Sequence, residues 1–231
     1  MKEEKLQNNN FRYERKFFIT RMDAIAVENI ILQNPAFFSE IYSERWVNNI
    51  YFDYLGFNNF LDNVVGNMYR KKYRIRWYGD MFSEIHKPKL ELKIKEGLLG
   101  DKKIFQLVPF KIDIGINLSI FKDIIINSKI NSEIEFNIHE QIPVMLNRYK
   151  RKYFESSNKK FRITIDNQQS FFKLNKFNNT FLQNYKDPDS VILEIKYNHK
   201  YDLEAAQISN NFPFRLSKSS KYARGVELLY C

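Results

Sequence analysis

The sequence predicts an α+β protein built on an antiparallel sheet, and three observations carry that prediction. Several segments alternate apolar and charged residues with the two-residue period of a β-strand. Other segments place apolar residues at helical spacing, as residues 20–34 do before Pro35. The charged faces of the strands are mostly cationic, which an ordinary solvated face would not be.

Size and composition favour one domain. The 231 residues are 44% hydrophobic, enough for one substantial core, so we expect a polar tail at 1–10 and a single domain at 11–231. The net charge of +10 indicates an acidic partner: nucleic acid, polyphosphate, a phosphorylated metabolite or an anionic membrane. The single cysteine, Cys231, excludes a disulfide framework and fits a reducing compartment. Without an apolar run of bilayer length we expect a cytoplasmic protein, reaching a membrane through its basic surface or through a partner.

The segment 72–77, Lys-Tyr-Arg-Ile-Arg-Trp, is the clearest strand, because its three basic residues share one face and its three apolar residues share the other. The same alternation recurs along the chain, and turn residues such as Gly97 and Gly100 separate two of its instances as a hairpin. Strands are expected at 11–19, 46–53, 72–77, 88–95, 104–108, 143–154, 161–166 and 191–197.

The helices are expected between these strands. Thr20 and Asp23 resemble a capping box at the start of the first helix. The β-branched run 124–126 is compatible with either helix or strand, and 57–65 with a short helix or a loop. The segment 217–225 is so rich in Ser and Lys that we expect it outside the core. Helices are expected at 20–34, 118–126, 132–138 and 203–210.

The charged faces carry ten basic and four acidic residues, an excess of six positive charges. Like charges on neighbouring strands repel, so such a face needs water or an anion beside it. Two arrangements satisfy this: an open sheet with a solvated basic face, or a barrel that encloses a polyanion, with the apolar faces outward under the helices. The residues are Arg12, Lys16, Lys72, Arg74, Arg76, Lys93, Lys95, Arg151, Arg162 and Lys196, against Glu14, Glu91, Asp166 and Glu194.

Six motifs, in order, resemble the VTC domain, the polyphosphate polymerase domain of the triphosphate tunnel metalloenzyme superfamily. They are residues 72–79, 90–95, 149–151, 162–166, 193–196 and 220–222, and the resemblance extends from about Phe11 to Tyr230. It implies an antiparallel β tunnel barrel with a polar, basic interior and helices packed outside. It also implies transfer of the γ-phosphate of ATP to polyphosphate with Mn²⁺ or Mg²⁺.

The resemblance also implies roles for individual residues. Glu194 matches the metal-ligand glutamate, with Glu14 and Glu91 as further candidates, and Lys16 matches the lysine near the transferred phosphoryl group. Arg12 departs from the Glu-x-Glu-x-Lys opening of the superfamily's hydrolases and cyclases, in agreement with the polymerase branch. The catalytic set is Lys16, Arg74, Arg76, Arg151 and Lys221, and the substrate-binding set is Arg12, Lys72, Lys93, Lys95, Tyr149, Arg162, Lys196 and Ser220.

Plainer interpretations remain for several of these residues. Glu14 and Glu91 are equally compatible with salt bridges that space the cations, and Asp166 with fixing the neighbouring arginines. Lys102 and Lys103 follow a glycine-rich turn, as loop lysines commonly do. The functional alternatives are a tunnel hydrolase acting on triphosphate or RNA 5′ ends, and a non-catalytic sensor of polyphosphate or inositol phosphate. A membrane-protein partner is compatible with the resemblance, whereas specific nucleic-acid binding is not expected because most strand aromatics lie on the apolar face.

Overall fold

The computed structural model describes residues 12–97 and 99–231, and within them the chain forms a nine-stranded antiparallel sheet and a separate two-stranded one. The predicted tail at 1–10 lies outside the described residues. The main sheet runs in the order β1-β11-β9-β8-β2-β3-β5-β6, with β10 beside β9. Its strands are β1 (Arg12–Ile19), β2 (Ser39–Asp53), β3 (Tyr69–Tyr78), β5 (Lys89–Glu96), β6 (Leu99–Gln106), β8 (Ile142–Glu155), β9 (Phe161–Lys173), β10 (Asn184–Asp187) and β11 (Val191–Asn198); β4 (Ser83–Ile85) pairs with β7 (Phe110–Ile112).

The predicted helices are confirmed, and residues 124–126 are helical. Asp23 alone caps the first helix, because its Oδ1 accepts a hydrogen bond from Ala26 N at 2.8 Å. None of the helices in the described ranges is long and apolar enough to span a bilayer. The helices are α1 (Ala24–Leu32), α2 (Asn58–Val65), α3 (Ile120–Asn127), α4 (Ser132–His139), α5 (Asp202–Asn210) and α6 (Lys221–Tyr230), with a 3₁₀ turn at His199–Tyr201.

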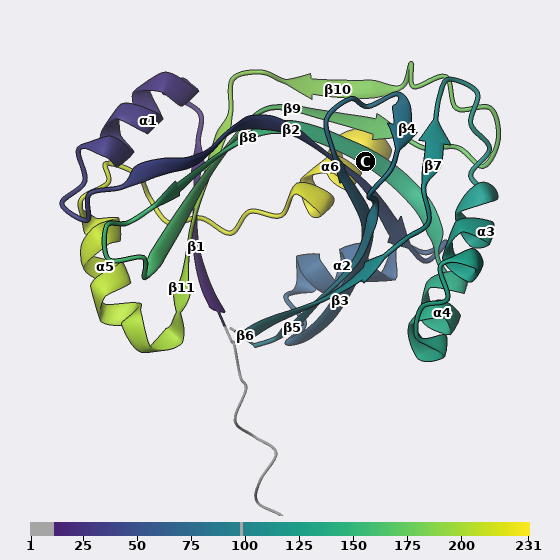
Figure 1. Ribbon diagram of the computed structural model, residues 1–231, viewed down its shortest axis with the longest axis horizontal. Helices are drawn as coiled ribbons and strands as arrows, with labels where there is room; N and C mark the ends of the chain where they lie inside the picture. The colour runs from purple at the N-terminus through teal and green to yellow at the C-terminus, as the bar shows by residue number, and fades with distance from the viewer. Residues whose placement is uncertain (1–11, 98) are drawn as a thin grey trace, which may run out of the picture.

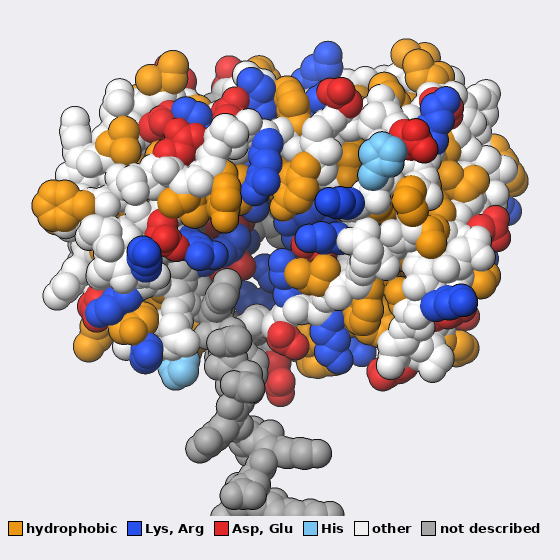
Figure 2. All heavy atoms as spheres, in the orientation of Figure 1, with side chains coloured by type: hydrophobic (Ala, Val, Ile, Leu, Met, Phe, Trp, Pro, Cys, Tyr) orange, Lys and Arg blue, Asp and Glu red, His pale blue; other side chains and the backbone are white. Residues whose placement is uncertain are grey.

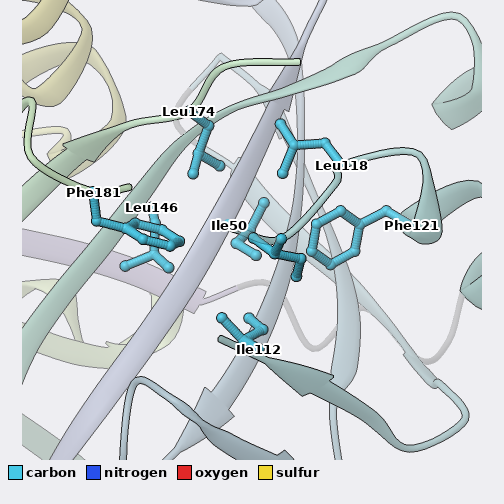
Figure 3. Close-up of a pocket in the computed structure, with 8 residues that line it drawn as sticks. Ile50, Ile112, Leu118, Phe121, Leu146, Leu174 and Phe181 are labelled. Atoms are coloured by element: carbon cyan, nitrogen blue, oxygen red, sulfur yellow. The ribbon is translucent and has the colours of Figure 1, made fainter. Parts of the chain in front are cut away.

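Two apolar cores cover the convex face of the sheet (Figure 1). One lies under α1 and α5, against β1, β9 and β11. The other lies under α3, α4 and the β4–β7 pair, where residues such as Ile50, Phe121 and Leu146 pack so closely that no water molecule fits between them (Figure 3). The apolar residues of the alternating strands therefore point outward under helices, as the sequence predicts.

The sheet curls until its two ends meet. In a flat sheet the six spacings from β1 to β5 would separate these strands by roughly 29 Å. Instead, Lys93 Nζ on β5 lies 3.0 Å from Glu14 Oε2 on β1, and Cα atoms of β1 and β6 approach within 8 Å. Figure 1 shows the resulting arch around a central space.

The arch differs from the expected barrel in how it closes. Within the described residues β1 and β6 form no hydrogen-bonded ladder and remain the two edges of the sheet. The Glu14–Lys93 ion pair spans this seam, so side chains rather than backbone hydrogen bonds join the ends.

The last helix, α6, lies on the concave side and packs against α2, whereas α1, α3, α4 and α5 cover the convex face as expected (Figure 1). Gly225 allows this close approach: a Cβ there would collide with side-chain atoms of Met145 and Phe171. Lys221 and Tyr222 are buried, so the expectation that 217–225 lies outside the core is wrong. Tyr222, Val226 and Leu229 are at helical spacing and form one apolar stripe, which allows the helix to pack against the sheet although the segment is polar in composition.

Candidate functional site: a cationic tunnel wall

Basic side chains gather on the concave face, and Figure 2 shows a hollow at the centre of one end with Lys and Arg side chains around it. Strand alternation places them there, because the opposite face is committed to the two cores. Ten cations and four carboxylates, an excess of six positive charges, form what we call the tunnel wall. It comprises Lys16, Lys72, Arg74, Arg76, Lys93, Lys95, Lys102, Arg151, Lys196 and Lys221 with Glu14, Glu91, Asp166 and Glu194.

Glu194 lies between two lysines. Its Oε1 is 3.0 Å from Lys16 Nζ across the β1–β11 ladder, and its Oε2 is 3.0 Å from Lys196 Nζ. Burial alone would raise the pKa of Glu194, but Lys16 and Lys196 outweigh it and hold the pKa well below its usual range. Burial likewise opposes the charge on Lys16, but Glu194 and Glu14 raise its pKa. Both groups are therefore ionised at neutral pH.

Glu91 holds a second group of cations on β3 and β6. Its Oε2 lies 2.6 Å from Arg74 Nη2 and 3.6 Å from Arg76 Nη1, and its Oε1 lies 3.4 Å from Lys102 Nζ. Burial would raise the pKa of Glu91, but Arg74 and Arg76 lower it more. Arg76 also donates to Tyr149 Oη at 3.1 Å. One carboxylate thus holds three cations in place, and the net charge of the group remains positive.

Asp166 holds the third group and is completely buried. It accepts hydrogen bonds from Arg151 Nε at 2.5 Å and Nη2 at 2.6 Å, and its Oδ2 lies 2.5 Å from Lys221 Nζ. The Arg151 guanidinium and the Lys221 ammonium also lie 5.2 Å and 4.7 Å from the centre of the Tyr149 ring. Tyr149 therefore connects this group to Arg76.

Lys72 contacts neutral partners: its Nζ donates to Asn63 Oδ1 at 2.8 Å and to Ser220 Oγ at 3.0 Å. Among the residues that the structure describes, it pairs with no carboxylate. Burial, together with Lys93 and Arg70, lowers the pKa of Lys72 to about 7. Burial also lowers the pKa of Lys93 to about 8, although Glu14 opposes the shift. These lysines are sites where a bound anion would be most stabilising.

Most of the predicted site residues lie on the tunnel wall or contact it. Arg162 lies opposite Lys196 and therefore shares the concave face, but it is mostly exposed at the end of β9 and pairs with Glu155 at 2.9 Å, which places it at the rim of the wall. The side chain of Arg12 lies outside what the structure describes. Lys95 is half-buried beside Arg70 on β3.

Lys102 was missed by the sequence reasoning, which treated it as a loop lysine. It lies opposite Lys93 on β6 and contacts Glu91. The β5–β6 register carries the signal, because a residue directly opposite Lys93 must share its face.

The donor set fits one hard divalent cation when phosphate is present. Glu194 is ionised and Lys16 lies between it and Glu14, with Lys16 Nζ 3.4 Å from Glu14 Oε2. Within the described ranges no cluster of three or more His, Cys, Asp or Glu side chains forms a cage. Mg²⁺ and similar ions commonly take one or two carboxylates and complete their shell with phosphate oxygens and water. Glu194 and Glu14 would hold such an ion, replacing part of the lysine contact.

Comparison with known proteins gives a family and a fold. The family model described as the VTC domain matches residues 11–230. An X-ray structure of a candidate adenylate cyclase from Vibrio parahaemolyticus superposes with a TM-score of 0.52 at 12% identity, covering 96% of this chain and 98% of that one, so the two share a fold. The PH1819 protein of Pyrococcus horikoshii has a TM-score of 0.47 at 11% identity, covering 93% and 95%. No curated protein matches the chain.

Proposed function

Because the chain belongs to the VTC domain family, we propose that it is a polyphosphate polymerase that transfers the γ-phosphate of ATP to the end of a polyphosphate chain inside the tunnel. The family supports the broader function, a tunnel protein that handles phosphate with a divalent metal. One observation carries the finer proposal: the excess of six positive charges on a concave wall whose cations come from β1, β3, β5, β6, β8, β11 and α6.

Unpartnered polar atoms support a polar occupant. Asn49 Nδ2, Asn147 Oδ1 and Thr164 Oγ1 are buried with no hydrogen-bond partner among the described residues, and strand alternation places all three on the concave side. Buried polar groups are seldom left unpaired, so a ligand or water completes them. A hydrated phosphate chain would balance the positive charge of the wall and would supply hydrogen-bond partners for these buried polar atoms.

Phosphoryl transfer asks for alignment and charge neutralisation rather than a nucleophilic side chain. Arg74, Arg76 and Arg151 hold phosphate oxygens by paired N–H donors from rigid strands. Lys16, fixed by Glu194 and Glu14, neutralises charge on the migrating group. The terminal oxygen of the chain attacks the γ-phosphorus, a new P–O bond forms, and the bond to the β-phosphate oxygen breaks to release ADP. Glu194 and Glu14 would hold a divalent ion, which would supply further charge neutralisation for the phosphates.

The test is incubation of the protein with ATP and Mn²⁺, followed by gel separation of the products. A ladder of long phosphate chains together with ADP is the expected result. Free phosphate without chains would exclude the polymerase and favour a tunnel phosphohydrolase. Absence of turnover with tight polyphosphate binding would favour a sensor.

A further inference from the structure

An irregularity in β2 turns two side chains toward the same place. Tyr42 pairs with Tyr153 and Arg45 pairs with Arg151, so between these pairs two residues of β2 oppose one of β8. In a regular strand, residues 42 and 45 would point to opposite faces. The extra residue places both on one side, as bulges next to functional sites commonly do.

Three tyrosines surround the guanidinium that the bulge delivers. The Arg45 Cζ lies 4.4 Å from the centre of the Tyr78 ring, 4.6 Å from that of Tyr153 and 5.2 Å from that of Tyr42. Tyr42 stands perpendicular to Tyr153 with ring centres 5.7 Å apart. Tyr78 is 45% exposed and Tyr42 is 56% exposed, so both residues remain partly open to solvent beside the guanidinium. We call these four residues the tyrosine platform.

Arg45 carries an uncompensated charge. Among the described residues it pairs with no carboxylate, and its Nε has no hydrogen-bond acceptor. Neighbouring wall arginines such as Arg74 and Arg151 do have carboxylate partners. An anionic group beside Arg45 would supply what the protein does not.

The platform adjoins the tunnel wall. The Arg151 guanidinium lies 5.8 Å from the Tyr153 ring, and Tyr153 pairs with Thr164, which pairs with Glu194. Along β8, Tyr153, Arg151 and Tyr149 follow each other toward α6 at intervals of roughly 7 Å, two residues of strand. A molecule seated on the platform can therefore extend a chain of phosphates directly along the wall.

We propose that the tyrosine platform binds the nucleobase of the nucleoside triphosphate donor, with Arg45 at its first phosphate. Polyphosphate has no planar apolar group, so exposed rings beside a phosphate site fit the one substrate that has a base. Stacking on tyrosine is tolerant of base identity, because each base has a π face. This inference rests on the proposed function for the identity of the donor.

The experiment compares ATP with inorganic tripolyphosphate, which has the phosphates without the base, by calorimetry without divalent metal. Tyr78→Ala should weaken ATP binding roughly tenfold, in the range of base–aromatic stacking, and leave the affinity for tripolyphosphate unchanged. Tyr78→Phe keeps the ring and should bind ATP as the native protein does. Tyr69→Ala is the matched control, because Tyr69 is an exposed tyrosine at the other end of the same strand and is 55% exposed.

The outcomes separate the platform from the proposed function. Unchanged tripolyphosphate binding also reports that Tyr78→Ala is folded. An equal loss of affinity for ATP and tripolyphosphate in Tyr78→Ala would overturn the platform and leave the proposed polymerase function intact. An unchanged affinity for ATP in this variant would do the same. If the native protein binds no tripolyphosphate, the proposed function fails, and AMP then becomes the probe for the platform. Loss of AMP binding in Tyr78→Ala would uphold the platform. A native protein that binds no AMP would overturn it.

Discussion

Lys16 and Glu194 face each other across the β1–β11 ladder, with Nζ and Oε1 3.0 Å apart. Each group of the pair keeps the other charged although burial opposes both charges. In the polymerase that we propose, Lys16 would meet the phosphoryl group protonated and Glu194 would meet a divalent ion ionised.

Glu194→Gln should separate metal-dependent turnover from anion binding. The amide keeps the shape of the side chain but removes its charge, so turnover should fall by roughly 100-fold or more. Tripolyphosphate binding without metal should be retained, because the substitution removes a negative charge from the wall. Glu84→Gln is the control, since Glu84 is an exposed carboxylate on β4. Initial rates with ATP and Mn²⁺ decide the matter, and unchanged turnover in Glu194→Gln would exclude the ligand role.

Polyphosphate binding should take up protons near pH 8. The pKa values of Lys72 and Lys93 in the free protein are about 7 and about 8, so both lysines are partly deprotonated there. A bound polyanion raises both values, and affinity should therefore increase as pH falls from 9 through these values. Calorimetry in two buffers of different ionisation enthalpy measures the uptake. Lys72→Met should reduce the proton uptake. Lys87→Met should not, because Lys87 is an exposed lysine. Polyphosphate binding without proton uptake would refute this pKa assignment.

Asp166→Asn should destabilise the protein strongly. The substitution leaves Arg151 and Lys221 buried without their shared carboxylate, a loss of about 3–5 kcal/mol for a broken buried pair. Urea denaturation measures it, with the exposed Asp189→Asn as control. Tripolyphosphate should recover part of the loss, because it binds only the folded state. A change below about 1 kcal/mol, as at an exposed ion pair, would show that Asp166 is dispensable to the wall.

Two arginines on the concave face, one buried and one at the rim, test where along the tunnel phosphate binds. Arg76 is buried on the concave face, whereas Arg162 is 58% exposed and paired with Glu155. Arg76→Met should weaken tripolyphosphate binding roughly tenfold or more, the range of a charge-assisted hydrogen bond, and reduce its salt dependence. Arg162→Met should change the affinity little. The reverse ranking would place the phosphate site at the rim of the tunnel and not along its buried wall.

Alternation alone was sufficient to predict the longer strands and most of the wall, but not the short strands β4, β7 and β10. The residues of 72–77 split into a basic and an apolar face because a strand has a period of two, and β3 follows this split. The same rule gives the face of a residue but not its exposure: Arg162 shares the face of Thr164 and Asp166, yet it lies where β9 begins and pairs with Glu155 in solvent.

Features that depend on tertiary contacts could not be predicted from the sequence. The position of α6 depends on the close approach at Gly225, which composition does not reveal. The open seam depends on how far the sheet curls, and periodicity carries no information on curvature. The tyrosine platform depends on an extra residue in β2 between Tyr42 and Arg45, which breaks the very period used to assign faces.

A crystal structure with bound tripolyphosphate tests the central claim most directly, that the wall cations jointly bind a phosphate chain. The account predicts a continuous chain on the concave side, within hydrogen-bonding distance of Arg74, Arg76 and Arg151. Phosphates bound only on the convex surface, with those arginines still held by Glu91 and Asp166 alone, would contradict it.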